Sequence, residues 1–247
     1  MIKIEKFTRL KNGNYKLVLD NKLNIEVHED LILKHDLLLT KSLNEELIET
    51  ILEEQKIYDI YNIALKYIKV RMRSIKEIEN YLLKKKYEQN QIDDALSILK
   101  KQGYLNNDNY AKAFIHDKIV LSNYGPLKIK DELIKNGIEI EKIEESIIEF
   151  TEELELERIN KLVTKYLKTI HNTSSYMLKR KIENNLNTLG YHNYLIQEVL
   201  NSLDINDEEE YKKEYEKLYK KLSRKYEGKE LETKIKQKLY QKGYKVN

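Results

Sequence analysis

The spacing of apolar residues divides the chain into a short β-rich start and a long helical remainder. Near the start apolar residues alternate with charged ones, which predicts three short antiparallel strands: Ile2 to Phe7, Tyr15 to Leu19 and Leu23 to Val27. Asn12-Gly13 is a strong signal for the first hairpin turn. An apolar stretch from Leu31 to Leu39 leads out of the sheet. Three strands alone are marginally stable, so we expect the following helix to cover them.

Beyond residue 40 the apolar period becomes that of amphipathic helices. Ser42-Leu43-Asn44-Glu45 has the form of a capping box and predicts a helix to about Glu54, with a second helix from about Tyr58 to Val70. Ser74 and Glu77 form another capping box at the start of a helix that runs to about Lys86. A further helix is expected from about Gln91 to Gln102, ended by Gly103.

The pair Ile78 and Leu82, four residues apart on one helix face, recurs along the chain. Matching pairs precede three glycines: Ile129 and Leu133 before Gly137, Ile182 and Leu186 before Gly190, and Ile235 and Leu239 before Gly243. The glycines are separated by two equal intervals of 53 residues. Lys86 holds the corresponding place in the first unit, so it either adopts a left-handed conformation at some cost or ends its helix differently.

A period near 50 with three helices per unit predicts a mainly α protein of tandem three-helix repeats that form an elongated array, with a small N-terminal antiparallel β element. The expected segments are the N-terminal sheet and helix at 1–55, repeats at 56–105, 106–151 and 152–204, and a truncated fourth repeat at 205–247. A single all-α domain with chance spacing is the alternative, and the equal glycine intervals favour the repeats.

Composition excludes several kinds of site. The chain has no cysteine, so it has no disulfides and no thiolate metal sites, which fits a cytoplasmic protein. No apolar run reaches the length of a membrane span, and the first residues do not resemble a signal peptide. Phosphate-loop, dinucleotide-binding and hydrolase motifs are absent, and the five histidines are scattered. We therefore expect no catalysis, no cofactor and no bound metal.

The candidate functional residues are basic. They gather near helix starts and ends, and in a stacked array they would line one side as a basic stripe for a partner or for DNA: Arg71, Arg73, Lys76, Lys84, Lys85, Lys128, Lys130, Lys179, Arg180 and Lys181. A solvated surface is the alternative for each lysine, because acidic residues are also abundant and the net charge is only +3. Exchange of both Arg71 and Arg73 for Glu is expected to weaken partner binding while the fold stays intact.

Several motifs together resemble the RecX family. They include Arg71-Met72-Arg73-Ser74 with Glu77-Ile78 and Tyr81-Leu82, and Gly103-Tyr104-Leu105-Asn106-Asn107-Asp108 with Tyr110-Ala111 and Phe114-Ile115. Ser122, Gly125-Pro126, Ile129, Glu132-Leu133 and Gly137-Ile138 continue the likeness, which is strong from about 58 to 150 and weaker to 247.

This resemblance implies a modulator of the RecA recombinase. Its members are tandem three-helix repeats that bind in the groove of the filament formed by RecA on single-stranded DNA. They usually limit filament growth, ATP hydrolysis and strand exchange, and some bind DNA directly. By this resemblance we expect a monomer that contacts the RecA filament and single-stranded DNA but no membrane. Lys86 departs from the family pattern, in which a glycine is expected.

Two other functions fit the same residues. The first is a DNA-binding helical module that acts without RecA, whose affinity would fall steeply with salt. The second is a helical adaptor for an unrelated protein, which would depend neither on DNA nor on the filament.

Overall fold

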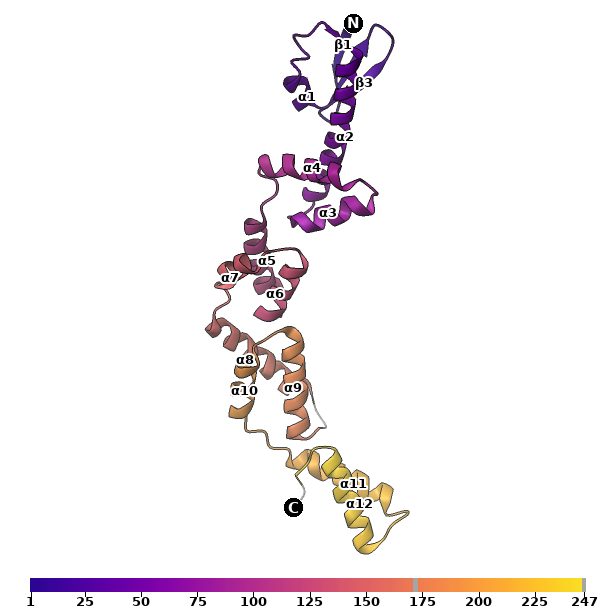
Figure 1. Cartoon of the computed structure of the whole chain (residues 1–247). Coiled ribbons are helices and arrows are strands. Elements are labelled where there is room, and N and C mark those ends of the chain that lie inside the picture. Colours follow the sequence, from indigo (N-terminus) through magenta and orange to yellow (C-terminus); the bar gives the residue numbers. More distant parts are fainter. Residues whose placement is uncertain (171–172, 246–247) are drawn as a thin grey trace. The chain divides into compact units, whose positions relative to one another are not determined.

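The computed structural model describes residues 1–170 and 173–245. The chain forms two compact units, one of Met1–Tyr110 with Asn136–Ile138 and the other of Ala111–Lys135 with Glu139–Asn247. The predicted class is confirmed, because a small antiparallel sheet at the N-terminus is followed by helices grouped in threes (Figure 1).

The N-terminal sheet has four strands rather than the three predicted. They are β1 (Ile2–Arg9), β2 (Tyr15–Leu19), β3 (Asn24–Val27) and β4 (Ser42–Leu43). All neighbouring strands are antiparallel, in the order β3-β2-β1-β4. The sequence hides β4, because Ser42 and Leu43 look like the start of a helix but pair with β1 instead. The true helix cap is Asn44, whose side chain accepts a hydrogen bond from the backbone N–H of Leu47 at 2.8 Å.

The stretch after β3 also contains a helix that the sequence did not predict. Helix α1 spans Glu29–Lys34 and buries Leu31 and Ile32 against the sheet. Its N-cap is His28, whose Nδ1 accepts a hydrogen bond from the backbone N–H of Asp30 at 3.2 Å. Histidine is not among the residues that usually mark a helix start, which explains why the pattern missed this helix.

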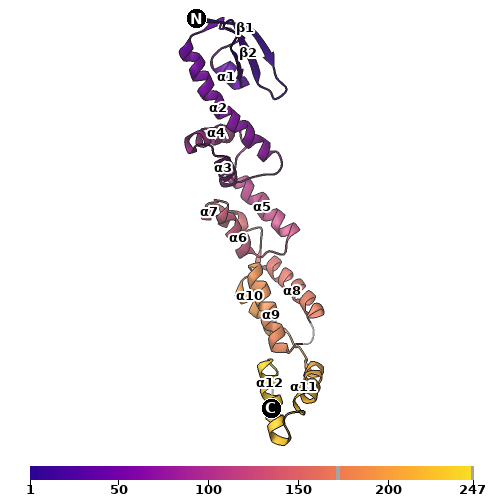
Figure 2. The same cartoon turned by 90° about the vertical axis from the view of Figure 1, so that its right-hand side faces the viewer.

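The two helices predicted on either side of residue 55 are one helix, α2 (Glu45–Ile68). Its sequence contains neither Gly nor Pro, so nothing interrupts it. The first half covers the sheet with Ile48 and Ile51, as expected, and the second half enters another core with Ile60 and Ala64. Figure 2 shows α2 running on from the sheet toward α3 and α4. The change from the sheet core to the core of the first repeat thus takes place within α2, between Ile51 and Ile60.

The first repeat adds α3 (Ile75–Lys84) and α4 (Gln89–Lys101) to the second half of α2. The predicted capping box at Ser74 is confirmed, because both of its reciprocal hydrogen bonds are present. Lys86 adopts the left-handed conformation, with φ 68°, and so follows the first of the two alternatives that the sequence left open.

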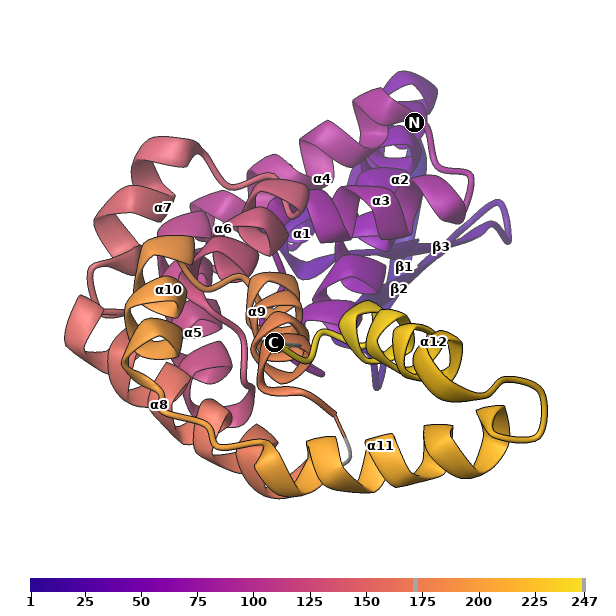
Figure 3. The same cartoon turned by 90° about the horizontal axis from the view of Figure 1, so that it is seen from below.

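The later repeats follow in chain order. The second consists of α5 (Asn107–Leu121), α6 (Pro126–Lys135) and α7 (Ile140–Ile147). The third consists of α8 (Glu152–Thr169), α9 (Ser175–Leu189) and α10 (Asn193–Ser202), each longer than the corresponding helix of the second repeat. The fourth has two helices in the described part of the chain, α11 (Glu208–Leu222) and α12 (Gly228–Gln241), which lie side by side around a core of their own (Figure 3).

Gly190 shows why the repeat requires glycine at the end of its second helix. It ends α9 with φ 82° and lies directly against the first turn of α6. Two hydrogen bonds join the helix ends: Gly125 N–H donates to the Leu189 carbonyl at 2.7 Å, and Leu127 N–H donates to the Gly190 carbonyl at 3.0 Å. The free N–H groups of one helix thus satisfy the free carbonyls of the other. A Cβ on Gly190 would lie 2.5 Å from the Cβ of Lys128, which is too close.

The other two periodic glycines also lie against the start of a helix, but their close contacts are with side-chain atoms. Gly243 lies against the first turn of α9, and the Ser174 hydroxyl donates to the Lys242 carbonyl at 2.7 Å. Gly137, which belongs to the first compact unit, lies against the side-chain stem of Lys76. We call Gly137, Gly190 and Gly243 the joint glycines. Each joint glycine lies against a helix of the preceding repeat. Lys86 belongs to the first repeat and is exposed, so its position requires the left-handed backbone conformation but no close contact with another helix.

We expect Gly190→Ala to lower the free energy of unfolding by roughly 3 kcal/mol or more. The left-handed conformation costs about 1–2 kcal/mol for alanine, and the crowding at Lys128 adds about 1–3 kcal/mol. Gly228→Ala is the matched control, because Gly228 also has positive φ, 55°, but no atom lies within 4 Å of its added Cβ. Denaturant unfolding followed by circular dichroism measures both. Equal losses in the two variants would show that the joint contact contributes nothing.

Candidate partner-binding surface

The structure brings Arg71 and Arg73 together around one carboxylate. Arg71 Nη2 lies 2.5 Å from Glu77 Oε1, and Arg73 Nη1 lies 3.5 Å from the same oxygen. The second oxygen of Glu77 accepts the backbone N–H of Ser74 at 3.0 Å, which completes the capping box. Both arginines therefore hold the start of α3 in place.

Arg73 is fixed further by aromatic side chains. Its guanidinium carbon lies 4.0 Å from the ring centroid of Tyr67, which stacks on Tyr81 with 4.0 Å between centroids. Such cation–π contacts are favourable when the cation is partly removed from water, and the Arg73 side chain is only 13% exposed. An approaching partner can reach Arg71, which is 52% exposed, but little of Arg73.

This arrangement changes what a double charge reversal would test. A Glu at both positions 71 and 73 would place two carboxylates beside Glu77, and the capping box would lose its counter-charges. We therefore expect charge reversal at both positions to destabilise the start of α3, so loss of binding in that variant would not isolate a partner contact.

Most of the predicted lysines also have partners within the chain. Lys130 pairs with Glu144 at 2.7 Å, and Lys179 donates to the Leu203 carbonyl at 2.8 Å. Lys128 lies over the ring of Tyr124 at 4.2 Å and donates to the Thr188 carbonyl at 3.5 Å. Lys85 lies 5.2 Å from the ring centroid of Tyr81, and the stem of Lys76 covers Gly137. These residues serve helix ends and joints.

Besides Lys76, which is exposed and whose ammonium makes no hydrogen bond or ion pair within the described residues, three predicted residues remain available to a partner: Lys84, Arg180 and Lys181. They are exposed, and within residues 1–170 and 173–245 none of them has a recorded hydrogen bond, ion pair or aromatic partner. Lys84 lies on α3, and the other two lie on α9. The structure therefore separates the predicted candidates into internally engaged and free groups.

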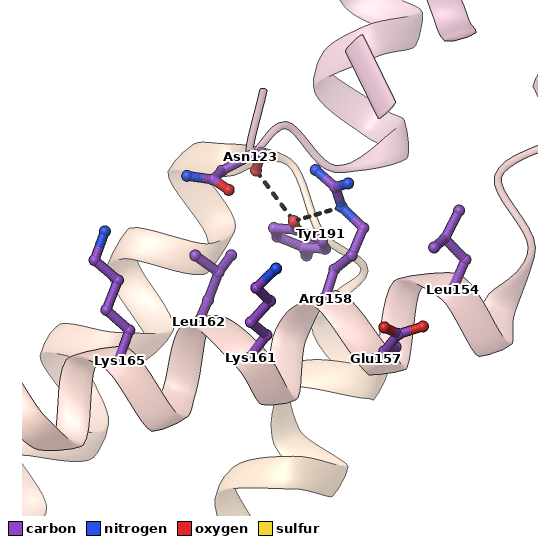
Figure 4. A pocket seen from close by; sticks show the side chains of 8 residues that line it. All are labelled: Asn123, Leu154, Glu157, Arg158, Lys161, Leu162, Lys165 and Tyr191. Carbon is purple, nitrogen blue, oxygen red and sulfur yellow. Dashed lines mark hydrogen bonds between the residues drawn. The ribbon is translucent and has the colours of Figure 1, made fainter. Parts of the chain in front are cut away.

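A cavity beside α8 was not predicted from the sequence. It measures about 330 Å³ and is lined mainly by residues of α8, with Asn123 and Tyr191 opposite. Figure 4 shows Arg158, Lys161 and Lys165 rising from α8 on the side that faces Tyr191. The sequence signal was weak, because these residues sit on an ordinary charged helix face.

Arg158 uses this position to complete the end of α5. Its guanidinium donates to the carbonyls of Ile119, at 2.7 Å, and Ser122, and its Nε lies 3.4 Å from the Tyr191 hydroxyl. A cation suits the carbonyl-rich C-terminal end of a helix. Lys161 and Lys165 add positive charge at the same cavity, which Glu157 partly offsets. The arrangement suits an anionic group rather than a catalytic step.

The part of the chain that the structure describes has no cluster of metal-ligating side chains and no helix long and apolar enough to cross a membrane.

Comparison with known proteins gives consistent matches. The family model for the first three-helix domain of RecX matches residues 61–99, and the one for its second three-helix domain matches residues 106–147. Regulatory protein RecX of Halalkalibacterium halodurans is 34% identical over 184 residues, which cover 74% of this chain and 69% of that protein. Regulatory protein RecX of Listeria monocytogenes serotype 4b is 32% identical over 200 residues, with coverage of 79% and 74%.

Solved structures share the fold. A crystal structure of a regulatory protein RecX superposes with a TM-score of 0.72 at 24% identity and covers 82% of this chain and all of that chain, 100%. The crystal structure of RecX from Lactobacillus salivarius superposes with a TM-score of 0.55 at 28% identity and covers 61% of this chain and 98% of that one.

We expect the contribution of Glu77 to stability to disappear in acid. Burial alone would raise the pKa of Glu77, but hydrogen bonds from Arg71 and the Ser74 backbone hold this pKa below the usual value for a glutamate. A carboxyl whose pKa is lowered by folding stabilises the fold above its unfolded pKa, and the contribution is lost as pH falls through the folded value. The difference in unfolding free energy between the unmodified chain and Glu77→Gln should shrink over that range. A pH-independent difference would contradict the role given to this carboxylate.

We expect Arg158→Met to lower the free energy of unfolding by about 2 kcal/mol, because two helix-end carbonyls lose a charged donor. Lys161→Met is the matched control on the same helix, and removal of this exposed lysine should change stability by less than about 0.5 kcal/mol. Denaturant unfolding compares them. Similar values for the two variants would remove Arg158 from the structural role described.

Proposed function

The chain belongs to the RecX family, and from this membership we propose that it regulates the RecA recombinase by binding the filament that RecA forms on single-stranded DNA. The relatives are named as regulatory proteins and not as enzymes. The observation that carries the proposal is the match of both three-helix domains at residues 61–99 and 106–147, together with the identity that continues over most of the chain.

We further propose that regulation takes the form of inhibition, with slower ATP hydrolysis and limited filament growth. A protein that occupies several neighbouring subunits of a polymer opposes the rearrangements that growth and turnover require. Tandem repeats suit such a polymer, because each repeat can present a similar surface to a similar subunit.

The free basic groups support a contact with the DNA or with acidic protein surface. Lys84, Arg180 and Lys181 are exposed and are not engaged in the described chain, so binding need not break an internal ion pair. Arg71 contributes through its exposed face while it continues to hold Glu77.

A DNA-binding module that acts without RecA is the second candidate. The sequence pI near 8.6 and the free basic groups favour it. The net charge of +3 is small for tight duplex binding, which depends on neutralising many phosphates.

The deciding measurement compares binding of the labelled chain to RecA filaments on single-stranded DNA with ATP, to bare DNA and to free RecA. We expect the filament to be bound more tightly than bare DNA or free RecA, with a lower rate of ATP hydrolysis. Binding to bare DNA alone, with a steep loss in salt, would overturn the proposal in favour of the second candidate. Binding to neither would overturn both.

We expect the triple variant Lys84→Gln/Arg180→Gln/Lys181→Gln to bind the filament more weakly. If all three residues contact phosphates, the slope of log affinity against log salt should become shallower by about 2, at ~0.7 per contact with a single strand. Lys130→Gln is the matched control, because Lys130 already pairs with Glu144. Unchanged affinity and slope in the triple variant would remove these residues from the interface.

A further inference from the structure

We propose that the outer face of α11 binds unpaired nucleobases by stacking them on a row of tyrosines. Tyr211, Tyr215 and Tyr219 follow each other at four-residue intervals on this helix, and we call them the tyrosine row. The proposal rests on the proposed function for the source of the strand, which is the single-stranded DNA of a filament, and adds a direct contact with its bases.

The rings of the tyrosine row share one orientation. The centroids of Tyr211 and Tyr215 are 6.4 Å apart with planes inclined by 23°, and those of Tyr215 and Tyr219 are 6.4 Å apart with planes inclined by 19°. Tyr211 is anchored in the small core of the fourth repeat, where it meets Tyr244 edge-on at 5.7 Å. The row therefore begins on a fixed ring.

The next two rings are open to solvent. Tyr215 is 36% exposed and Tyr219 is 49% exposed. Two shallow cavities adjoin them, one of about 390 Å³ bordered by Tyr211, Lys212, Tyr215 and Glu216, and one of about 220 Å³ bordered by Tyr215, Glu216, Tyr219 and Lys220. Flat hollows between successive aromatic rings fit planar groups that arrive at a regular spacing.

The lysines beside the tyrosine row favour a negatively charged partner. Lys212 and Lys220 border the two cavities, and in the described chain neither has a recorded ion pair or hydrogen bond. From Lys212 to Lys225 the chain carries seven Lys or Arg residues and two Glu residues, whereas the first turn of α11 is acidic and its Glu209 pairs with Lys213 at 3.4 Å, so the positive charge lies beside Tyr215 and Tyr219. One of those two Glu residues, Glu214, is paired with Lys242 at 2.6 Å. Aromatic rings interleaved with cations bind single-stranded nucleic acid, because the rings stack on bases and the cations meet the backbone.

A protein partner is the competing occupant. An apolar peptide would also cover Tyr215 and Tyr219, but it would leave the excess positive charge beside them without a counter-charge. The strand supplies that charge with every nucleotide, so the observations favour it. The tyrosine row lies outside both segments that the RecX domain models match.

The test measures binding of the full chain to a labelled oligodeoxythymidylate, to the same strand without bases, and to a duplex. We expect Tyr215→Leu/Tyr219→Leu to bind the single strand about tenfold more weakly or worse, since each stacked base is worth about a five- to 150-fold change in affinity. The corresponding double Phe variant should bind nearly as well as the unmodified chain, because it keeps both rings. The strand without bases should bind the unmodified chain and the Leu variant alike.

Tyr240→Leu is the matched control, because Tyr240 is 74% exposed on α12 and lies outside the row. Stacking would be overturned if the Tyr215→Leu/Tyr219→Leu variant lost equal affinity for strands with and without bases, or if its affinity for the single strand were unchanged. If this variant instead lost affinity only for RecA in the absence of DNA, the face would bind a protein. The proposed function is tested separately, by the rate of ATP hydrolysis in the filament. A negative result for base stacking would therefore not affect that test.

Discussion

The fold depends on contacts in which one helix ends directly against the start of another. At Gly190 the carbonyl groups at the end of α9 accept N–H groups from the start of α6, and at Gly243 the cap of α9 donates to the end of α12. Each contact satisfies polar groups that a helix cannot satisfy internally, and it brings the positive start of one helix next to the negative end of another. The approach is close enough that only glycine fits at Gly190. The 53-residue interval is thus a requirement of packing as well as of backbone conformation.

Much of this was readable from the sequence. The capping box at Ser74 and the strands that follow alternation depend on local chemistry, which short patterns report well. The glycine interval also gave the repeat, although it could not show what each glycine touches. The place of Lys86 illustrates the limit: the sequence shows a missing glycine, while the structure shows that nothing crowds that position.

The rest could not be predicted because it depends on contacts between distant residues. The sequence predicted a break between two helices near Gln55, but Gln55 is buried in a continuous helix. There its side chain accepts a hydrogen bond from the His28 N–H at 2.7 Å and donates one to Asp59 at 2.8 Å. Charge alone marked Arg71 and Arg73 as partner contacts, while their geometry shows an internal role at Glu77. Arg158 was overlooked because its carbonyl partners lie more than thirty residues away in the chain.

The continuous helix α2 has a consequence for cooperativity. Helix α2 contributes side chains both to the sheet core and to the core of the first repeat. Unfolding of either core would therefore disturb the backbone hydrogen bonds of the helix on which the other core depends. The sheet and the first repeat should behave as one cooperative folding unit, with amide protection extending across the middle of α2 rather than dipping there. The N-terminal sheet then stabilises the first repeat and does not fold as an independent domain.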